Sequence, residues 1–511
     1  MRSTFHGLET ARRAMATQQS ALQTTGHNIA NASTPGYTRQ RVNFVQTEAY
    51  PGVGMNRPSI PGHLGTGVEA GSIQRVREGF LDTQFRGENS KDGFWTAKYE
   101  ALAKIEDIMN EPSDNGLSKT LDQFWQSLQD LSVTKEGRSV VRQRGQAVAE
   151  TFNYLSNSLS TIQEDIRLQT ELAATEINSL TTQIDNINKQ IKEVEPHGYL
   201  PNDLYDERDR LVDQLSGLVN IRVTTTPSGG LASPLAEGQY NIELLDKNGN
   251  PFTTPIMLLD SNTTPSSNTV SVEFNPINGM IDSVSVGNSS ISVMDLARGR
   301  LRGNIEAYGY NNGSTVVGIY PEMLTKLDEM AFAFANAFND IHSEGWSLDS
   351  IDAGVKKAYK FFDVGTAAAG AARSLKLHSD MDDLDHIAAA RPVPPETVAY
   401  SGDGSNALLL SGVKNKTISF STGTSTIQNF YKGVIGKLAV ETQEADRLSN
   451  NSQVLKNAVD QRRASVSGVS IDEEMSNMIQ YQHAYNAAAR NISVVDEMLD
   501  TIIKGMGIGG R

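Results

Sequence analysis

Hydrophobic residues near the end of the chain recur every seventh position. Two such rows, offset by three residues, lie on one face of an α-helix and form the pattern of a coiled-coil seam. The pattern predicts a helix over residues 471–506 whose apolar face is too narrow for a buried core helix, so this helix needs a partner. The first row consists of Met478, Tyr485, Ile492, Leu499 and Met506, and the second of Tyr481, Ala488, Val495 and Ile502.

A similar repeat marks the start of the chain and predicts a helix over residues 4–32. Its apolar row is flanked by Ala11, Ala14 and Ala21, whose small side chains permit the close approach of another helix. The turn sequence Thr34-Pro35-Gly36-Tyr37 ends it. Either helix alone could be an ordinary surface helix, but the two together favour a coiled-coil pair. The row consists of Leu8, Met15, Leu22 and Ile29.

A third heptad row runs over residues 152–194 and stops at Pro196. At about 1.5 Å per residue, this helix is a rod roughly 65 Å long. Such a rod suits an elongated subunit and fits poorly in a compact enzyme. Further amphipathic helices are predicted over residues 80–109, 116–132, 202–217 and 320–341, and again from residue 427 onward.

Residues 219–313 have a different character, because Thr, Ser, Asn, Gly and Val dominate and polar and apolar residues alternate. This pattern predicts β-strands. Asn248-Gly249 favours a hairpin turn, since this pair accepts left-handed backbone conformations. Residues 40–76 are rich in Gly and Pro and predict an extended arm with little regular structure. Residues 347–424 are rich in Gly, Ala and Ser and predict more loop than strand.

Together these patterns predict an α+β multidomain protein, with a long helical rod or coiled-coil body built from the N- and C-terminal segments and an inserted β-rich domain. The nested order of helix, strand and helix is expected to place both termini at one end of the molecule. The expected units are the N-terminal helix of an inner coiled-coil layer (1–40), an extended arm (41–76), a first helical rod part (77–218), an inserted β domain (219–314), a second rod part (315–346), a mixed segment (347–424), a return helix (425–469) and the C-terminal helix of the inner layer (470–511).

Composition narrows the possible environments of the chain. A net charge of −15 over 511 residues argues against nucleic-acid binding and against docking on an anionic membrane. The sequence lacks an apolar run of membrane-spanning length, so we expect no membrane insertion. Cysteine is absent, which is compatible with a cytosolic or an exported protein. Charged residues interrupt the first 23 residues, so no cleavable signal peptide is expected.

Motifs for catalysis are missing from the sequence. The eight histidines do not form a metal-binding pair on one helix face, and the zinc-protease and nucleophile-elbow patterns do not occur. Four aspartates within residues 380–385 lack the Gly and the final Glu of a calcium loop, so we interpret them as a solvated loop or helix start. We therefore expect no enzyme activity, no catalytic residues, no cofactor and no metal site.

Two stretches at opposite ends of the chain carry a family resemblance. Residues 26–40 (GHNIANASTPGYTRQ) resemble the N-terminal signature of bacterial flagellar axial proteins, the rod, hook and junction components. The form ending in Thr38-Arg39-Gln40 is typical of junction components. Residues 466–475 (VSGVSIDEEM), together with 480–485 (QYQHAY) and 496–500 (DEMLD), resemble the C-terminal part of the same family.

This resemblance implies a structural protein at the junction between flagellar hook and filament, needed for filament assembly. The implied partners are further copies of the chain in a ring, the hook protein, the second hook–filament junction protein and a cytoplasmic export chaperone that binds the C-terminal helix. The implied location is the extracellular flagellum, reached through the flagellar export apparatus. Alternatives are a hook or rod axial protein, or an adhesin displayed on the flagellum through the β domain.

The two seams suggest how such a subunit assembles. We expect the terminal helices to lack enough partners in the free subunit, and to pair and pack between neighbouring subunits during assembly. The expected assembly residues are both seams together with Asn28 and Asn31, which could cap their own helix or bond to a neighbouring subunit; the resemblance favours the neighbour. In the motif turn of Pro35, Gly36, Tyr37 and Arg39, we expect Tyr37 to pack over the turn and Arg39 to be solvated.

Overall fold

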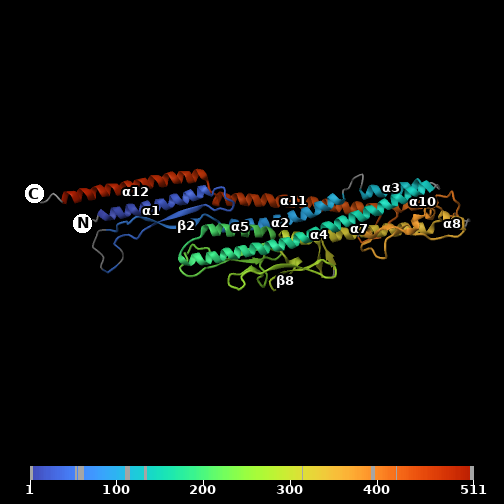
Figure 1. The fold of residues 1–511 in the computed structure, drawn as a ribbon, viewed down its shortest axis with the longest axis horizontal. Helices are drawn as coiled ribbons and strands as arrows, with labels where there is room; N and C mark the ends of the chain where they lie inside the picture. Colours follow the sequence, from blue (N-terminus) through green and yellow to red (C-terminus); the bar gives the residue numbers. More distant parts are fainter. Residues whose placement is uncertain are drawn as a thin grey trace.

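The protein is an elongated molecule with both chain ends at the same extremity, as the nested order of elements predicts (Figure 1). The computed structural model describes residues 4–51, 54–55, 62–109, 116–131, 135–313, 315–392, 398–421 and 423–506. It has three parts along its length. A terminal unit lies at the chain ends, a helical rod forms the middle, and a cap of short elements lies at the far end.

The terminal unit consists of two helices and a β-hairpin. Helices α1 (Thr4–Ala30) and α12 (Ile471–Met506) lie side by side, so the predicted partnership of the two chain ends is confirmed. Strands β1 (Gln40–Gln46) and β2 (Val68–Arg75) pair in antiparallel fashion and pack on α1.

This hairpin corrects the expectation of an arm with little regular structure. A strand is favoured by Val42, Phe44 and Val45. The many Gly and Pro residues of the following loop nevertheless led to the prediction of an irregular arm. Gly71 fits the hairpin because a Cβ atom there would lie 2.3 Å from Cγ2 of Val45. The register between the strands shifts beside it, at Asn43 and Phe44.

The rod is a bundle of long helices around one apolar core. Its longest helix is α4 (Lys135–Val194), which begins earlier than the predicted residue 152. The reason is that Val141 and Val148 extend the heptad spacing of Leu155 and are buried. The other helices agree with the predicted segments: α2 (Gly79–Met109), α3 (Leu117–Gln129), α5 (Asn202–Leu218), α7 (Ile319–Glu344) and α11 (Ile427–Ser467).

The β region lies along one side of α4 and shares its core (Figure 1). Asn178 and Asn188 of α4 fasten it, because each amide bonds both the N–H and the C=O of one strand residue, Val270 or Tyr240. The helix α6 (Arg300–Tyr308) follows these strands. One sheet has the order β3 (Ile221–Thr226), β4 (Gln239–Leu244), β5 (Met257–Leu259); the other contains β6 (Val270–Phe274), β7 (Ile281–Val286), β8 (Ser289–Ser292), β9 (Tyr310–Asn312) and β10 (Thr315–Val317).

One local prediction for this region can be checked directly. The hairpin turn at Asn248-Gly249 is confirmed, since Gly249 has φ +81° and the Asp246 carboxylate accepts from the backbone N–H groups of Asn248 and Asn250. Pro321 lies in the first turn of α7, where its missing N–H costs no hydrogen bond.

The far end of the rod is formed by residues 347–392, 398–421 and 423–424, which pack on α3, α4 and α7. It is mainly loop, with short helices and two-residue or three-residue strands, as the sequence predicts. The aspartates of residues 380–385 lie in two 3-10 turns. The core here is an aromatic cluster of Phe124, Trp125, Phe152, Phe334, Phe338, Phe361 and Phe362. The elements are α8 (Leu348–Ala353), α9 (Ala371–Ser374), α10 (Ser405–Ser411), β11 (Phe362–Asp363), β12 (Lys376–Leu377), β13 (Ile418–Phe420) and β14 (Gly423–Ser425).

Candidate functional site

The predicted seam of α12 faces α1 and β1 of the same chain. Val495 lies against Gly7 of α1, at 3.9 Å from the position a Cβ would take there. The ring of Tyr481 meets Phe44 of β1 edge to face, with centroids 5.9 Å apart. Ala488 is buried, whereas Ile502 is 47% exposed. The remaining seam residues with described side chains are half-buried: Met478, Tyr485, Ile492 and Leu499.

On α1, small residues make the tightest contacts. Ala11 and Ala21 are buried, in agreement with close helix approach, and Thr17 donates a hydrogen bond to the Val68 carbonyl of β2. The predicted row borders this contact and is half-buried: Leu8, Met15, Leu22 and Ile29. The pairing of the two helices is therefore satisfied within one chain.

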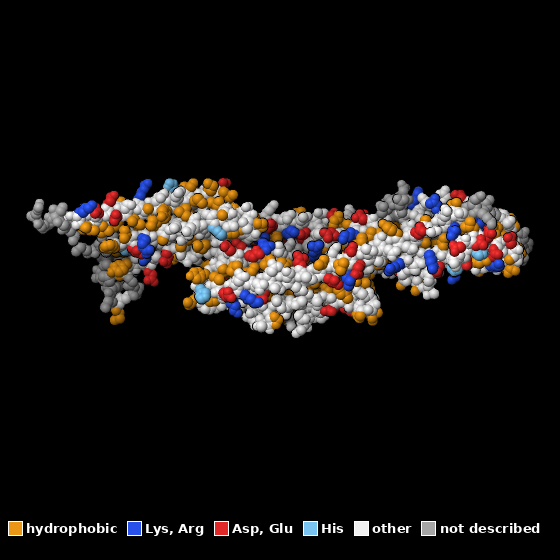
Figure 2. Space-filling view, viewed as in Figure 1, with side chains coloured by type: hydrophobic (Ala, Val, Ile, Leu, Met, Phe, Trp, Pro, Cys, Tyr) orange, Lys and Arg blue, Asp and Glu red, His pale blue; other side chains and the backbone are white. Residues whose placement is uncertain are grey.

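A second row of apolar residues on α12 stays exposed, and we name it the outer apolar band. Its members follow one another in steps of four, seven and eight, so they form a strip that winds around the helix and meets the predicted seam only at Ile502. Figure 2 shows hydrophobic side chains gathered along the terminal helices. The band consists of Ile471, Met475, Ile479, Ala487, Val494, Met498 and Ile502, and all of them are exposed.

Sequence reasoning missed this band, although its signal was present. The heptad rows account for only one face of α12, and of the band residues they include only Ile502. Between 47% and 55% of each large side chain of the band is exposed. A strip of large apolar side chains exposed to this extent on a surface helix is typical of a contact with another protein.

Asn28 connects the motif turn to the start of α12. Its Nδ2 donates to the Gln40 carbonyl (2.8 Å) and to Oε2 of Glu474 (3.0 Å). Its Oδ1 accepts from the Gln40 N–H (3.0 Å) and from the Tyr37 hydroxyl (2.8 Å). An asparagine amide has two donor hydrogens and two lone pairs, so its capacity is used. The expected bond from Asn28 to a neighbouring subunit is therefore wrong.

Asn31 also bonds within its own chain. Its Nδ2 donates to the His27 carbonyl at 3.1 Å, one turn back in α1. Its Oδ1 accepts from the Thr34 hydroxyl at 3.2 Å. Because these contacts satisfy the exposed end of the helix, Asn31 is a local cap.

Arg39 is paired rather than solvated, contrary to expectation. Its Nε donates to Glu474 (2.7 Å) and its terminal nitrogens donate to Glu473, the closer of them at 2.9 Å. Its backbone N–H donates to the Ser467 carbonyl at the end of α11 (2.8 Å). Glu474 is buried, so Arg39 compensates a charge that water cannot reach. The motif turn thus holds the junction of α11 and α12.

The other motif-turn residues position this contact. Tyr37 does pack over the turn, with its ring edge to face with His27 and its hydroxyl on Asn28. Burial, the first cause, together with nearby carboxylates, raises the pKa of Tyr37, so the hydroxyl stays a donor. Pro35 and Gly36 are exposed; Gly36 has φ +85° and a Cβ there would lie 3.3 Å from Arg210 of α5.

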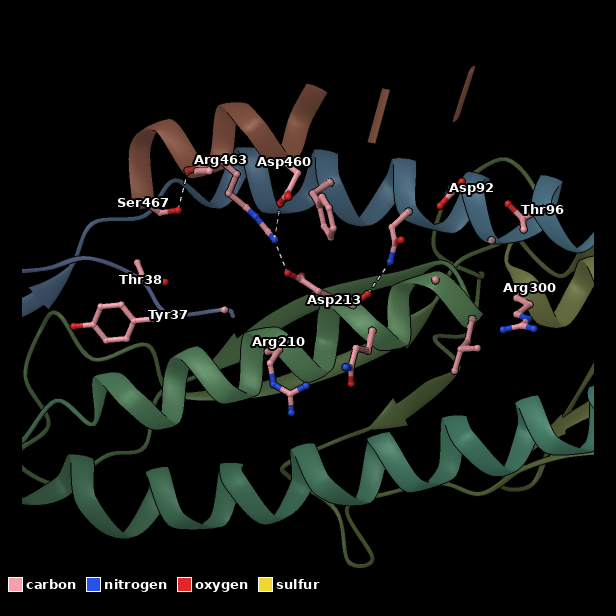
Figure 3. A pocket seen from close by; sticks show the side chains of 18 of the residues that line it. Tyr37, Thr38, Asp92, Thr96, Arg210, Asp213, Arg300, Asp460, Arg463 and Ser467 are labelled. Atoms are coloured by element: carbon pink, nitrogen blue, oxygen red, sulfur yellow. Dashed lines mark hydrogen bonds and ion pairs between the residues drawn. The ribbon is translucent and has the colours of Figure 1, made fainter. Parts of the chain in front are cut away.

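A groove of about 750 Å³ lies where the terminal unit meets the rod. Tyr37 and Thr38 line one end, and α2, α5 and α11 form its walls (Figure 3). Arg463 of α11 points across the groove to Asp213 of α5 (Figure 3). Within the described part of the chain, no group of three or more His, Asp or Glu residues is placed to hold a metal ion, and no helix is long and apolar enough to cross a membrane.

Comparisons with known proteins agree with the motifs. Family models match residues 102–356 (flagellar hook-associated protein FlgK helical domain), 8–38 (flagella basal body rod protein) and 460–504 (flagellar basal body rod FlgEFG protein C-terminal). The chain is 42% identical to flagellar hook-associated protein 1 of Bacillus subtilis, over the full length of both. It is 23% identical to that of Escherichia coli, over 95% of this chain and 97% of the relative.

Two further matches cover a smaller share of this chain. The protein of the same name from Salmonella typhimurium is 27% identical over 68% of this chain and 57% of its own. The solved structure of the flagellar hook junction protein FlgK from Burkholderia pseudomallei matches with a TM-score of 0.60 at 14% identity, over 75% of this chain and all of that one, and supports the fold. With a family model over the rod and a full-length relative at 42% identity, the chain belongs to the family of flagellar hook-associated protein 1, FlgK.

Proposed function

We propose that this chain is a structural protein of the junction between flagellar hook and filament and is needed for filament assembly. Membership of the FlgK family supports this role. The observation that carries it is the outer apolar band, because α12 already has its intramolecular partner and still exposes a strip of large apolar side chains. Moving one such side chain from full exposure to full burial contributes about 1.5–3 kcal/mol of favourable free energy.

The partner that covers this band is a neighbouring copy of the chain in a ring. The terminal unit is small, lies at one extremity of the molecule and presents the band along the whole of α12, so copies packed side by side can cover one another's bands. In this proposal the helices pair within the subunit, and the ring then buries the remaining apolar surface.

The further partners follow from the family. The hook protein lies on one side of the ring and the second junction protein on the other, and an export chaperone covers the C-terminal helix before the chain leaves the cell. Export proceeds through the flagellar apparatus, and the role requires no catalysis. If residues 471–511 are removed, a chaperone pull-down should lose its signal; an unchanged pull-down would reject the chaperone contact.

Complementation tests the junction role. A strain that lacks the gene should carry hooks without filaments and release filament protein into the medium, and the parent chain should restore filaments. If the deletion strain lacked hooks as well, the protein would instead be assigned to the rod or the hook. Normal filaments in the deletion strain would reject the proposal and leave adhesion through the β region as the next function to test.

A matched pair of variants tests the band in the same strain. Met498→Asp places a charge within the outer apolar band, whereas Ser493→Asp places one on the exposed polar face of the same helix. We expect the first to abolish filament growth and the second to support it, with equal helix content in both purified proteins. Equal filament growth on both variants would show that the band is not covered in the assembly.

A further inference from the structure

The connection between terminal unit and rod is built from charged side chains. Among the described residues, the continuous apolar core runs through the rod and its far end, and does not include the buried apolar residues of the terminal unit, Ala11, Ala21, Val42 and Ala488. At the boundary, five guanidinium groups meet five carboxylates. They are Arg75, Arg77, Arg86, Arg208 and Arg463, and Asp82, Asp206, Asp209, Asp213 and Glu237.

Asp209 of α5 is the centre of this network. Its Oδ2 lies 2.9 Å from Arg75 and 3.0 Å from Arg77, and its Oδ1 lies 3.0 Å from Arg86. The hydroxyl of Tyr240 donates to Oδ1 at 3.0 Å. Asp209 is 2% exposed. Burial alone would raise the pKa of Asp209, but the surrounding arginines outweigh it and hold the pKa well below its ordinary value, so the carboxylate stays charged.

The terminal unit and the rod each contribute a cation to this centre. Arg75 ends β2 of the terminal unit and also binds Asp206 of α5 at 2.7 Å. Arg86 belongs to α2 of the rod and binds Asp213 at 2.9 Å. Thr38 of the motif segment adds a backbone N–H to Asp206 at 3.0 Å. The hairpin, the motif segment and the rod helix α2 therefore converge on two successive turns of α5, from Asp206 to Asp213.

The same stretch of α5 also fixes the helix that leads into α12. Arg463, near the end of α11, pairs with Asp213 and lies 3.6 Å from Asp82 of α2. Its guanidinium stacks 4.1 Å above the ring of Phe85. Both chain segments that connect the terminal unit to the rod, the one before α2 and the one after α11, are thus attached to the network.

Buried ion pairs contribute little net stability, because the cost of removing their water offsets most of the attraction. They differ from apolar contacts in being directional, since each guanidinium fork matches a carboxylate in one orientation. An apolar boundary of the same size would let the terminal unit slide or tilt. A charge-paired boundary with fixed hydrogen bonds admits one arrangement.

We propose that the Asp209-centred network is a clamp that fixes the angle between the terminal unit and the rod, with Asp209 as a positioning residue for assembly. A ring accepts a subunit only if its terminal helices and its rod reach their neighbours together, so a fixed angle matters for growth. The consequence for growth rests on the proposed junction function, whereas the clamp itself does not.

The absence of cysteine makes the angle directly measurable. Ser493→Cys on α12 and Ser179→Cys on α4 place two spin labels at exposed positions, one on each side of the boundary. Pulsed electron–electron double resonance on the full chain then measures the distribution of distances between the two spin labels. In an Asp209→Asn background, we expect this distribution to broaden roughly twofold, because a boundary without its central charge acts as a hinge.

Asp185→Asn is the matched control, since Asp185 is also a buried carboxylate but bonds to Ser266 and Lys189 and to none of the five arginines of the network. It should leave the distribution as narrow as in the parent. If Asp209→Asn does not fold, Arg463→Met is the second test. It replaces the guanidinium, and with it the contacts to Asp213 and Phe85, by an unbranched apolar side chain, and it should broaden the distribution in the same direction.

An equally narrow distribution in the folded Asp209→Asn protein, or in Arg463→Met, would overturn the clamp. A broad distribution together with loss of filaments in the complemented strain supports its role in growth, and a broad distribution with normal filaments overturns that role. Failure of the junction function would appear separately, as normal filaments in the deletion strain, and would leave the distance measurement unchanged.

Discussion

Asn28 and Glu474 are 446 residues apart in the sequence, and the amide of the first donates to the carboxylate of the second at 3.0 Å. This contact joins the two stretches that carry the family resemblance, one at each end of the chain. The glutamate is buried, and Arg39 compensates its charge from the other side. The two sequence motifs are thus halves of one structural site, which closes the chain ends onto each other and onto the end of α11.

Replacement of Asn28 should loosen both terminal helices. Asn28→Asp removes the donor to Glu474 and places a second carboxylate beside it, which should cost about 1–3 kcal/mol. Hydrogen exchange should accelerate in α1 and in the first turns of α12, with the rod unchanged. Asn31→Ala is the control, because Asn31 bonds only to its own helix end and turn. Equal acceleration in both variants would contradict the assigned role of Asn28.

Arg39 should matter more than the exposed Arg41 two residues further on. Arg39→Met leaves Glu474 buried without its cation and should destabilise the terminal unit by about 1–3 kcal/mol. Arg41→Met should change stability by less than about 0.5 kcal/mol, as exposed substitutions usually do. Limited proteolysis near residues 467–470 measures the difference. Similar cleavage rates for both variants would show that the ion pair does not hold this junction.

Acid should weaken the far end of the rod through His342. This side chain is buried, donates from Nδ1 to the Tyr359 carbonyl and accepts at Nε2 from the Ala388 N–H. Burial, the main cause, lowers the pKa of His342 to about 4. The folded state therefore prefers the neutral ring. The resulting stability is fully present above about pH 6.5 and is lost as the pH falls toward 4, by up to about 3 kcal/mol.

Urea unfolding at pH 7.5 and at pH 4.5 of the parent and of His342→Gln checks this. The variant should lose less stability between the two pH values than the parent does, because it lacks the titrating ring. An identical loss in both proteins would assign the acid sensitivity to other groups.

Substitutions in the seam and in the outer apolar band should differ in their effect on α12 in the free subunit. Ile492→Asp charges the half-buried face against α1, so it should loosen α12 in the free subunit and also prevent incorporation. Met498→Asp charges only exposed surface, so it should prevent incorporation while hydrogen exchange of α12 in the free subunit stays at the parent rate. Faster exchange of α12 in Met498→Asp would mean that the band packs within the subunit.

The helical framework could be predicted because each long helix has a local periodicity of hydrophobic residues. Heptad rows are sufficient to place α4 and α12, and Pro321 and Gly345 mark the ends of α7. The start of α4 was missed because Val141 and Val148 continue a row that changes register. The hairpin was missed because its loop dominates the composition of residues 40–76.

The site was less predictable because its contacts are distant in sequence. The roles of Asn28 and Arg39 depend on Glu473 and Glu474, which read in isolation as polar surface of α12. Asp209 likewise lies among alternating charges of α5, a pattern typical of a solvated helix face. Its burial arises only when β2 and α2 bring Arg75 and Arg86 to it. A pattern within one segment of the sequence does not predict contacts with segments that are distant in the chain.

The most direct test of the central claim is the accessibility of the outer apolar band before and after assembly. In the otherwise cysteine-free chain, Met498→Cys reports the band and Ser493→Cys reports the polar face of the same helix. Maleimide labelling is compared in the free subunit and in isolated hook–filament structures. We predict rapid labelling of both cysteines in the free subunit, and protection of Met498→Cys alone after assembly. Equal labelling of Met498→Cys in both states would contradict the claim that neighbouring copies cover the band.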